Sequence, residues 1–267
     1  MKLLNVLFII TLFALCTPKA YCEVDNETNY LKVDKIIWAK YEDAMQRISQ
    51  ELKQHPEKRD SLKIISQKIY EDANMENVAA AIKYAATPSG IQRLFMVRLD
   101  MPKEKLKSVL DTLPESTKGN PYYLSLLRHL NCQQLEPGNE YADLDLFDPK
   151  GNKVNLSNLI NSKRTILVFD GLSCMGKEGR DELRSYVSQG ENVIIFIQAE
   201  SLMKLKEIVN TYPMNALFVS DFNGDRSEMK ILYGTQAVPT VFIINKDAKI
   251  VYKGLGIHLE EIKTYLK

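Results

Sequence analysis

Cys174 is the residue of this sequence with the clearest potential for chemistry. It follows the apolar run Thr165–Phe169 and begins a stretch, to about Ser188, whose pattern predicts a helix. The first N–H groups of a helix have no intrahelical partner and carry partial positive charge, which favours a thiolate over a thiol. We therefore expect Cys174 to hold more thiolate at neutral pH than a free cysteine does. Such a sulfur is a nucleophile towards disulfides, sulfenic acids and other electrophiles.

Two charged residues lie close enough in sequence to act on this sulfur. Lys177 follows one helical turn later and could place an ammonium group beside a thiolate. It could equally be an ordinary solvated helix residue. Asp170 ends the apolar run, where a carboxylate could act as a base or, more commonly, cap backbone N–H groups. Cys174 itself could be an inert packed thiol, since free cysteines are often buried.

The other residues able to bind metals are scattered. His55, His129 and His258 lie far apart and share no ligand spacing with the cysteines. We therefore predict neither a metal nor a cofactor.

The first 22 residues have the pattern of an export signal. A lysine at position 2 precedes a mostly apolar run over residues 3–15, and Ala20-Tyr21-Cys22 places small residues where a signal peptidase cuts. The apolar run is short for a membrane span, so we predict cleavage after Cys22. A retained anchor helix and a lipoprotein anchored on Cys16 stay open as alternatives.

Export would leave fewer cysteines in the chain and would expose them to an oxidising compartment. After cleavage only Cys132 and Cys174 would be left. The mature chain would be secreted or would lie in the periplasm or cell envelope, where a pair of thiols can be oxidised. We predict no integral membrane span after the signal is removed.

The composition is that of an ordinary globular protein. The chain has 267 residues, of which 45% are hydrophobic and 26% charged, with a formal charge of +1. These values exclude a collagen, a disordered tail and a polytopic membrane protein. The near balance of 35 basic and 34 acidic residues argues against a dedicated nucleic-acid surface, so we predict no nucleic-acid partner.

The pattern of apolar residues divides the mature chain near residue 135. Over residues 29–130 they recur at helical spacing, which predicts an all-α domain of about five or six short helices over residues 23–134. Pro56 ends the first helix, and Asn74 is a candidate cap for a later one. From residue 135 to 267 short apolar runs alternate with helical stretches, and the predicted order β-α-β-α-β-β-α gives an α/β domain with a mixed sheet.

Four stretches of the second half carry a family resemblance. They are Leu135–Gly138 with Leu144–Asn152, then Val154–Leu159, then Leu167–Phe169 leading to Cys174, and finally Tyr233–Ile244. In this order they resemble the thioredoxin-like fold of the TlpA-like thiol–disulfide oxidoreductases, which are related to the alkyl hydroperoxide reductase/thiol-specific antioxidant group. The resemblance implies that Pro239 is cis and faces Cys174. It also implies that Val238, Pro239 and Thr240 bind an extended substrate segment.

The sequence departs from the family at the motif itself. Members carry Cys-x-x-Cys, often after a tryptophan, whereas here Lys177 takes the place of the second cysteine and Ser173 that of the tryptophan. An internal disulfide cannot form within Cys174-Met175-Gly176-Lys177. Cys132 could replace the missing thiol only if its Cα came within about 7 Å of that of Cys174.

Two functions are compatible with this motif. The first is a single-cysteine thiol–disulfide oxidoreductase of the cell envelope, in which Cys174 forms a mixed disulfide and Lys177 helps to keep the thiolate charged. Its partners would be protein or small-molecule thiols and disulfides. The second is a redox-inactive binding or scaffold protein, with the helical half as recognition surface. The sequence predicts no oligomeric state.

Overall fold

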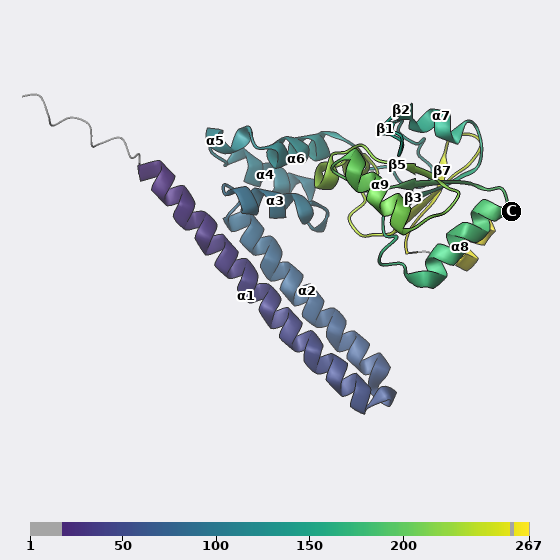
Figure 1. The fold of residues 1–267 in the computed structure, drawn as a ribbon. Helices are drawn as coiled ribbons and strands as arrows, with labels where there is room; N and C mark the ends of the chain where they lie inside the picture. The colour runs from purple at the N-terminus through teal and green to yellow at the C-terminus, as the bar shows by residue number, and fades with distance from the viewer. Residues whose placement is uncertain (1–17, 257–258, 267) are drawn as a thin grey trace, which may run out of the picture. The chain divides into compact units, whose positions relative to one another are not determined.

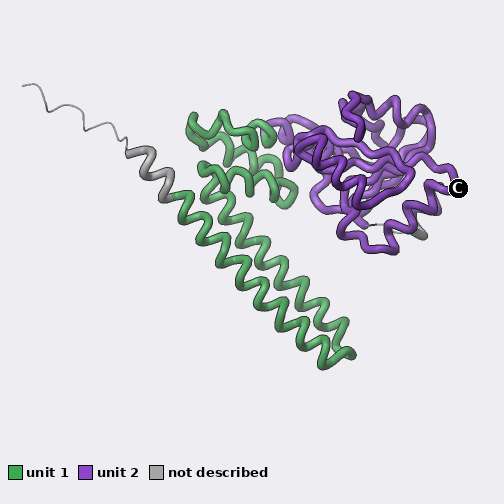
Figure 2. The backbone as a smooth tube through the Cα atoms, in the orientation of Figure 1, with its two compact units in different colours: residues 1–126 green, residues 127–267 purple. Residues whose placement is uncertain are grey.

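The described chain divides between Leu126 and Leu127. The computed structural model describes residues 18–256 and 259–266, and Figure 2 colours the two units, Met1–Leu126 and Leu127–Lys267. Residues 1–17 of the predicted leader and His258 lie outside the described residues. The domain boundary at 134/135 stays a prediction from the sequence.

The first unit begins with a pair of long antiparallel helices (Figure 1). They are α1 (Pro18–Gln54) and α2 (Arg59–Lys83), joined by the short 3-10 turn η1 (Pro56–Lys58). As predicted, the chain leaves α1 just before Pro56. The expectation of uniformly short helices is wrong here, and Asn74 lies inside α2 instead of capping a helix. The reason is that residues 59–83 contain neither glycine nor proline to interrupt the helix.

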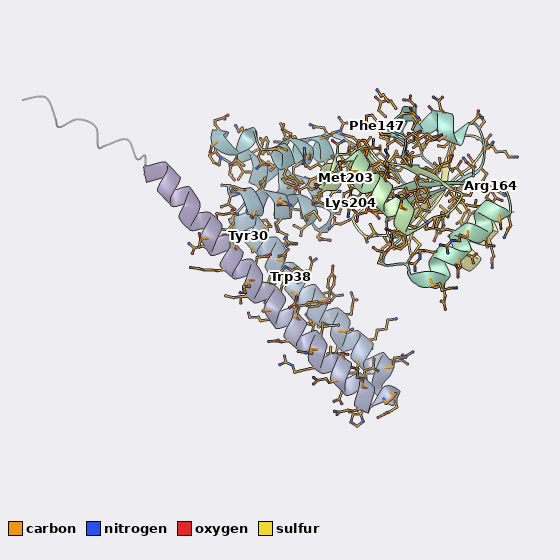
Figure 3. All side chains as sticks on the ribbon, in the orientation of Figure 1. Tyr30, Trp38, Phe147, Arg164, Met203 and Lys204 are labelled. Carbon is orange, nitrogen blue, oxygen red and sulfur yellow. The ribbon has the colours of Figure 1, made fainter. Side chains whose placement is uncertain are left out.

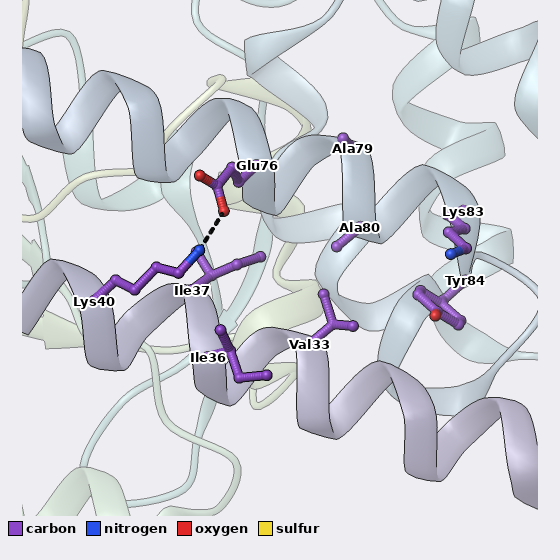
Figure 4. Close-up of a pocket in the computed structure, with 9 residues that line it drawn as sticks. All are labelled: Val33, Ile36, Ile37, Lys40, Glu76, Ala79, Ala80, Lys83 and Tyr84. Atoms are coloured by element: carbon purple, nitrogen blue, oxygen red, sulfur yellow. Dashed lines mark ion pairs between the residues drawn. The ribbon is translucent and has the colours of Figure 1, made fainter.

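The hairpin formed by α1 and α2 has a small core. Its buried apolar residues are Tyr30, Ile37, Ala73 and Ala80. Tyr30 and Trp38 lie on α1 (Figure 3), and the guanidinium carbon of Arg93, in the later helix α3 (Pro88–Met96), lies 5.8 Å from the centroid of the Trp38 ring. A groove of about 380 Å³ runs between the two helices, bordered by the ion pair of Lys40 and Glu76 at 3.8 Å (Figure 4).

Short helices complete the all-α part. They are α3 (Pro88–Met96), η2 (Arg98–Asp100), α4 (Lys103–Asp111), α5 (Glu115–Lys118) and α6 (Pro121–Asn131). Local caps start two of them: the side chain of Thr87 accepts a hydrogen bond from Gly90 N, and that of Asn120 accepts one from Tyr122 N. An all-α region therefore precedes the sheet, as the sequence predicts.

The second unit is built on a five-stranded mixed sheet. Its strands are β3 (Thr165–Phe169), β4 (Asn192–Phe196), β5 (Leu217–Val219), β6 (Thr240–Ile244) and β7 (Ile250–Leu255), in the spatial order β5-β4-β3-β6-β7. The strands β3, β4 and β5 run parallel, whereas β6 is antiparallel to both β3 and β7.

Helices cover both faces of this sheet. One face packs against α8 (Gly176–Ser188), α9 (Leu202–Thr211) and α11 (Leu259–Leu266). The other packs against α7 (Leu156–Ile160), α10 (Glu228–Leu232) and the small hairpin of β1 (Asp145–Phe147) and β2 (Lys153–Asn155). A short turn, η3 (Gly224–Arg226), precedes α10. Strands covered on both sides read as continuous apolar runs, which is why the sequence located them. The predicted α/β thioredoxin-like fold is confirmed.

Candidate thiol site

The pairing of two strands brings the predicted site residues together. The end of β3 pairs with the start of β6, so that Phe169 lies opposite Thr240. The turn that follows β3 and carries Cys174 therefore lies beside Val238–Pro239, the segment that precedes β6.

Cys174 is exposed and faces the carbonyl group of Val238. Its Sγ lies 3.4 Å from Val238 O and 3.3 Å from Gly171 O, at hydrogen-bond distance for a thiol. The peptide bond between Val238 and Pro239 is cis, as the family resemblance implies. Val238 is 43% exposed, so the surface beside the sulfur is open and partly apolar.

The helix after Cys174 begins two residues later than predicted. Cys174 N and Met175 N both donate to Gly171 O, at 3.1 and 2.9 Å, and so form a tight turn. Gly176 then has a left-handed φ of 69° at the first position of α8. A residue in this conformation cannot continue the preceding turn into a regular helix. The sulfur is therefore held at a turn in front of α8 and does not belong to its first turn.

Gly171 fits this turn closely against the Val238–Pro239 segment. Its φ is 88°, in the region that favours glycine, and an added Cβ would lie 2.6 Å from Pro239 N. No side chain can occupy that space without moving one of the two segments. Gly171 therefore sets the separation between the Cys174 turn and Pro239, a role that the sequence analysis did not assign.

Asp170 caps the backbone next to the site. Its carboxylate accepts hydrogen bonds from Gly171 N at 2.6 Å and from Gln198 N at 3.0 Å. Both oxygens thus hold the ends of β3 and β4 in place. Of the two roles considered from the sequence, the geometry matches the cap and not the base.

Lys177 makes its ion pair away from the turn. Its Nζ lies 2.6 Å from Oδ2 of Asp181, one turn further along α8, and its side chain is 83% exposed. This hydrogen bond is the main reason that the pKa of Asp181 is lowered from its usual value. Thr240, the first residue of β6, is buried and donates through Oγ1 to Ala237 O at 2.7 Å.

Cys132 lies in a different environment. It follows α6, and its Sγ lies 3.5 Å from His129 O and 3.6 Å from Ile231 O. No disulfide joins it to Cys174 in the described chain. The side chain of His129 is buried and contacts Gln134, with 2.7 Å between Nδ1 and Nε2.

The described residues hold neither a metal-binding cluster nor a helix that could span a membrane. Residues 18–256 and 259–266 contain no group of three or more His, Cys, Asp or Glu side chains placed to hold a metal ion. Within the same ranges, no helix combines the length and the apolar character needed to cross a membrane.

Comparison with known proteins identifies relatives of about half of the chain. No family model matches. The thiol-disulfide oxidoreductase ResA of Bacillus anthracis is 29% identical over 143 residues, which is 51% of this chain and 79% of that protein, and the protein of that name from Bacillus thuringiensis gives the same values. The predicted resemblance to thioredoxin-fold thiol–disulfide oxidoreductases is thereby confirmed.

Solved structures of similar proteins carry the same description. One is the thioredoxin domain of a thiol-disulfide oxidoreductase from Bacteroides vulgatus, with a TM-score of 0.43 and 19% identity, covering 50% of this chain and 100% of that one. Another is a thiol-disulfide oxidoreductase from Bacteroides fragilis, with a TM-score of 0.42 and 19% identity, covering 48% of this chain and 97% of that one.

Proposed function

We propose that this protein is an exported thiol–disulfide oxidoreductase that works through the single cysteine Cys174. The observation that carries the proposal is the place of the sulfur, which is exposed and 3.4 Å from Val238 O. A nucleophile beside an open backbone segment can attack a disulfide while that segment holds the chain that carries it. Relatives named thiol-disulfide oxidoreductase support the same class of reaction.

The proposed chemistry is an exchange through a mixed disulfide. The Cys174 thiolate attacks one sulfur of a substrate R–S–S–R′, a Cys174–S–S–R bond forms, and R′–S⁻ leaves with the electron pair of the broken bond. A second thiolate then attacks the R sulfur and releases Cys174 as a thiolate. The cysteine is regenerated, and no cofactor takes part.

The second thiolate in this proposal comes from outside the motif. Lys177 stands three residues after Cys174 and has no sulfur. The resolving thiol would belong to the substrate, to a partner protein or to a small molecule. A further source of the resolving thiol is Cys132, and a count of the thiols left in the oxidised mature protein would detect it.

We assign substrate binding to the segment before β6. Val238 is partly exposed beside the sulfur, whereas Pro239 and Thr240 are buried and anchor the segment to the sheet. Pro239 O is further held by a hydrogen bond from Gly256 N at 2.8 Å. An extended peptide lying along this segment would bring its disulfide to Cys174, so a protein or peptide disulfide is the expected substrate.

Trapping of the mixed disulfide tests the proposal. The purified chain is incubated with a peptide disulfide, quenched with acid and mapped by mass spectrometry. We expect an adduct on Cys174, which Cys174→Ala abolishes and Cys132→Ala leaves unchanged. Absence of an adduct in the unaltered chain, or persistence of the adduct in Cys174→Ala, would refute the proposal.

A second candidate function is binding without turnover. It is favoured by Lys177, whose ammonium group is engaged with Asp181, so that the motif position of a second cysteine belongs to a surface ion pair. In that case Cys174→Ala would capture the same partners as the unaltered chain. Loss of disulfide-linked partners in that variant would instead support the exchange reaction.

Export and domain roles complete the proposal. We propose cleavage after Cys22, a helical domain over residues 23–134 that recognises partners, and a thioredoxin-like domain over residues 135–267. The mass of the chain recovered from the cell envelope tests the cleavage. A mass that includes residues 1–22 would contradict it.

A further inference from the structure

Arg180 contacts the turn that carries Cys174 and has no role in the reaction proposed above. It lies in α8, and its Nη1 donates a hydrogen bond to Leu172 O at 2.7 Å. The guanidinium carbon also lies 5.2 Å from the centroid of the Tyr212 ring, at the end of α9. The group is thus held from two sides, by an aromatic ring and by a carbonyl oxygen in the turn that carries Cys174.

Leu172 is an anchor point of that turn. Its side chain is 1% exposed and packs in the core on the α8 face of the sheet. Its carbonyl group lies two residues before Cys174. A hydrogen bond from a charged donor to a carbonyl is shorter and stronger than a neutral one, so Arg180 fixes this peptide unit firmly.

Two charged residues of opposite sign therefore hold consecutive peptide groups at the start of the turn. Asp170 holds the N–H of Gly171, and Arg180 holds the carbonyl of Leu172. Between these points Gly171 O accepts the hydrogen bonds from Cys174 N and Met175 N. The place of the sulfur opposite Val238 depends on all of these bonds, because the turn has no regular helix of its own.

We infer that Arg180 is a positioning residue for the thiol exchange, which places Cys174 Sγ opposite the Val238 carbonyl by holding Leu172 O. The inference rests on the proposed function. It concerns the orientation of the sulfur towards a substrate lying on Val238 and not the intrinsic reactivity of the thiol. A reaction that needs both the sulfur and this segment should depend on Arg180 more than one that needs the sulfur alone.

Two reagents separate these cases on the full-length chain. A peptide disulfide must lie along the Val238 segment, whereas iodoacetamide requires only access to the sulfur. In Arg180→Met, which keeps an apolar side chain but loses the donor, we expect the rate constant for the peptide disulfide to fall about tenfold and that for iodoacetamide to change less than about twofold. Arg180→Lys can still donate and should recover part of the loss.

Arg184 supplies a matched control on the same helix. Its side chain is 41% exposed, pairs with Asp181 at 2.7 Å and donates to Pro213 O at 3.5 Å. Arg184→Met removes an arginine of α8 without touching the hydrogen bond to Leu172 O. We expect it to leave both rate constants unchanged.

The outcomes separate the inference from the proposed function. Equal losses with both reagents, or a profile of Arg180→Met equal to that of Arg184→Met, would overturn the role of Arg180. If the unaltered chain forms no mixed disulfide, the proposed function fails on its own. Amide hydrogen exchange at Cys174 and Met175 then decides whether Arg180 orders the turn. Faster exchange in Arg180→Met than in Arg184→Met supports that role, and equal exchange refutes it.

Discussion

The two cysteines of the second unit have similar hydrogen bonds but different access to solvent. Each sulfur lies near two carbonyl oxygens, at 3.3 and 3.4 Å for Cys174 and at 3.5 and 3.6 Å for Cys132. Cys174 is exposed at a turn in front of α8, whereas Cys132 is half-buried between the end of α6 and α10. The distances to carbonyl oxygens therefore do not distinguish a reactive thiol from a packed one here. The backbone that presents the sulfur does.

We expect the largest effect in the rates at which the two cysteines are alkylated. Cys174 can meet a reagent without any movement of the chain, whereas the half-buried Cys132 is fully reached only after local opening. We expect Cys174 to react with iodoacetamide on the order of 50-fold faster than Cys132 in the native protein. Mass spectrometry of the two labelled peptides over time measures both rates. In denaturant they should agree within about twofold if folding alone causes the difference. Faster labelling of Cys132 than of Cys174 in the native state would contradict this explanation.

Two glycines close to Cys174 test whether the conformation of the turn determines the reactivity of this cysteine. Gly171 has a φ of 88° and no room for a Cβ beside Pro239, whereas at Gly176, with a φ of 69°, an added Cβ meets no described heavy atom within 4 Å. We expect Gly171→Ala to lower the free energy of unfolding by about 3 kcal/mol and to slow mixed-disulfide formation about tenfold, because the clash adds to the strain. Gly176→Ala should cost about 1 kcal/mol, from strain alone.

Denaturant titration and the peptide-disulfide rate measure these effects together. Labelling of Cys132 in native Gly171→Ala serves as the internal control and should not slow. Equal effects of the two glycine variants would mean that the approach to Pro239 does not set the position of the sulfur.

The sheet could be predicted from the sequence because its three central strands, β4, β3 and β6, are buried on both faces. Runs such as Thr165–Phe169 and Val193–Ile197 contain no polar alternation that could be mistaken for an edge strand. The bounds of the long helices were harder to predict. An apolar spacing of three and four predicts a helix but not its end, and Asn74 looked like a cap although α2 continues through it.

The candidate site was predictable only in part. The family resemblance placed Val238 and Pro239 opposite Cys174, and the structure has this arrangement. The start of α8 was missed because a left-handed Gly176 cannot be told from an ordinary helical glycine in one sequence. Arg180 was missed for another reason. Its bond to Leu172 O spans eight residues and depends on the angle at which α8 leaves the turn, which no periodicity encodes.

The ion pair of Lys177 and Asp181 tests whether a nearby charge adds to the difference in reaction rate between the two thiols. Here we expect the smallest effect. The ammonium group of Lys177 lies 2.6 Å from Asp181 and is well solvated. We therefore expect Lys177→Met to slow the reaction of Cys174 with a peptide disulfide by less than about twofold, and Asp181→Asn, which releases the ammonium group, to speed it by a similar factor. The gain should vanish at high salt, where exposed charges are screened.

The pH dependence of this pair has a definite sign. The pKa of Asp181 is lowered chiefly by the hydrogen bond from Lys177, so the carboxylate stays charged below the pH at which an unpaired aspartate takes up its proton. The ion pair is complete above the ordinary pKa of an aspartate and is lost only as pH falls through the lowered value. The ratio of the Lys177→Met rate to that of the unaltered chain should thus be constant between about pH 5 and 8. Initial rates of mixed-disulfide formation across this range measure it. A tenfold loss in Lys177→Met would show instead that the ammonium group reaches the sulfur during the reaction, in which case a charge, as well as the turn, separates Cys174 from Cys132.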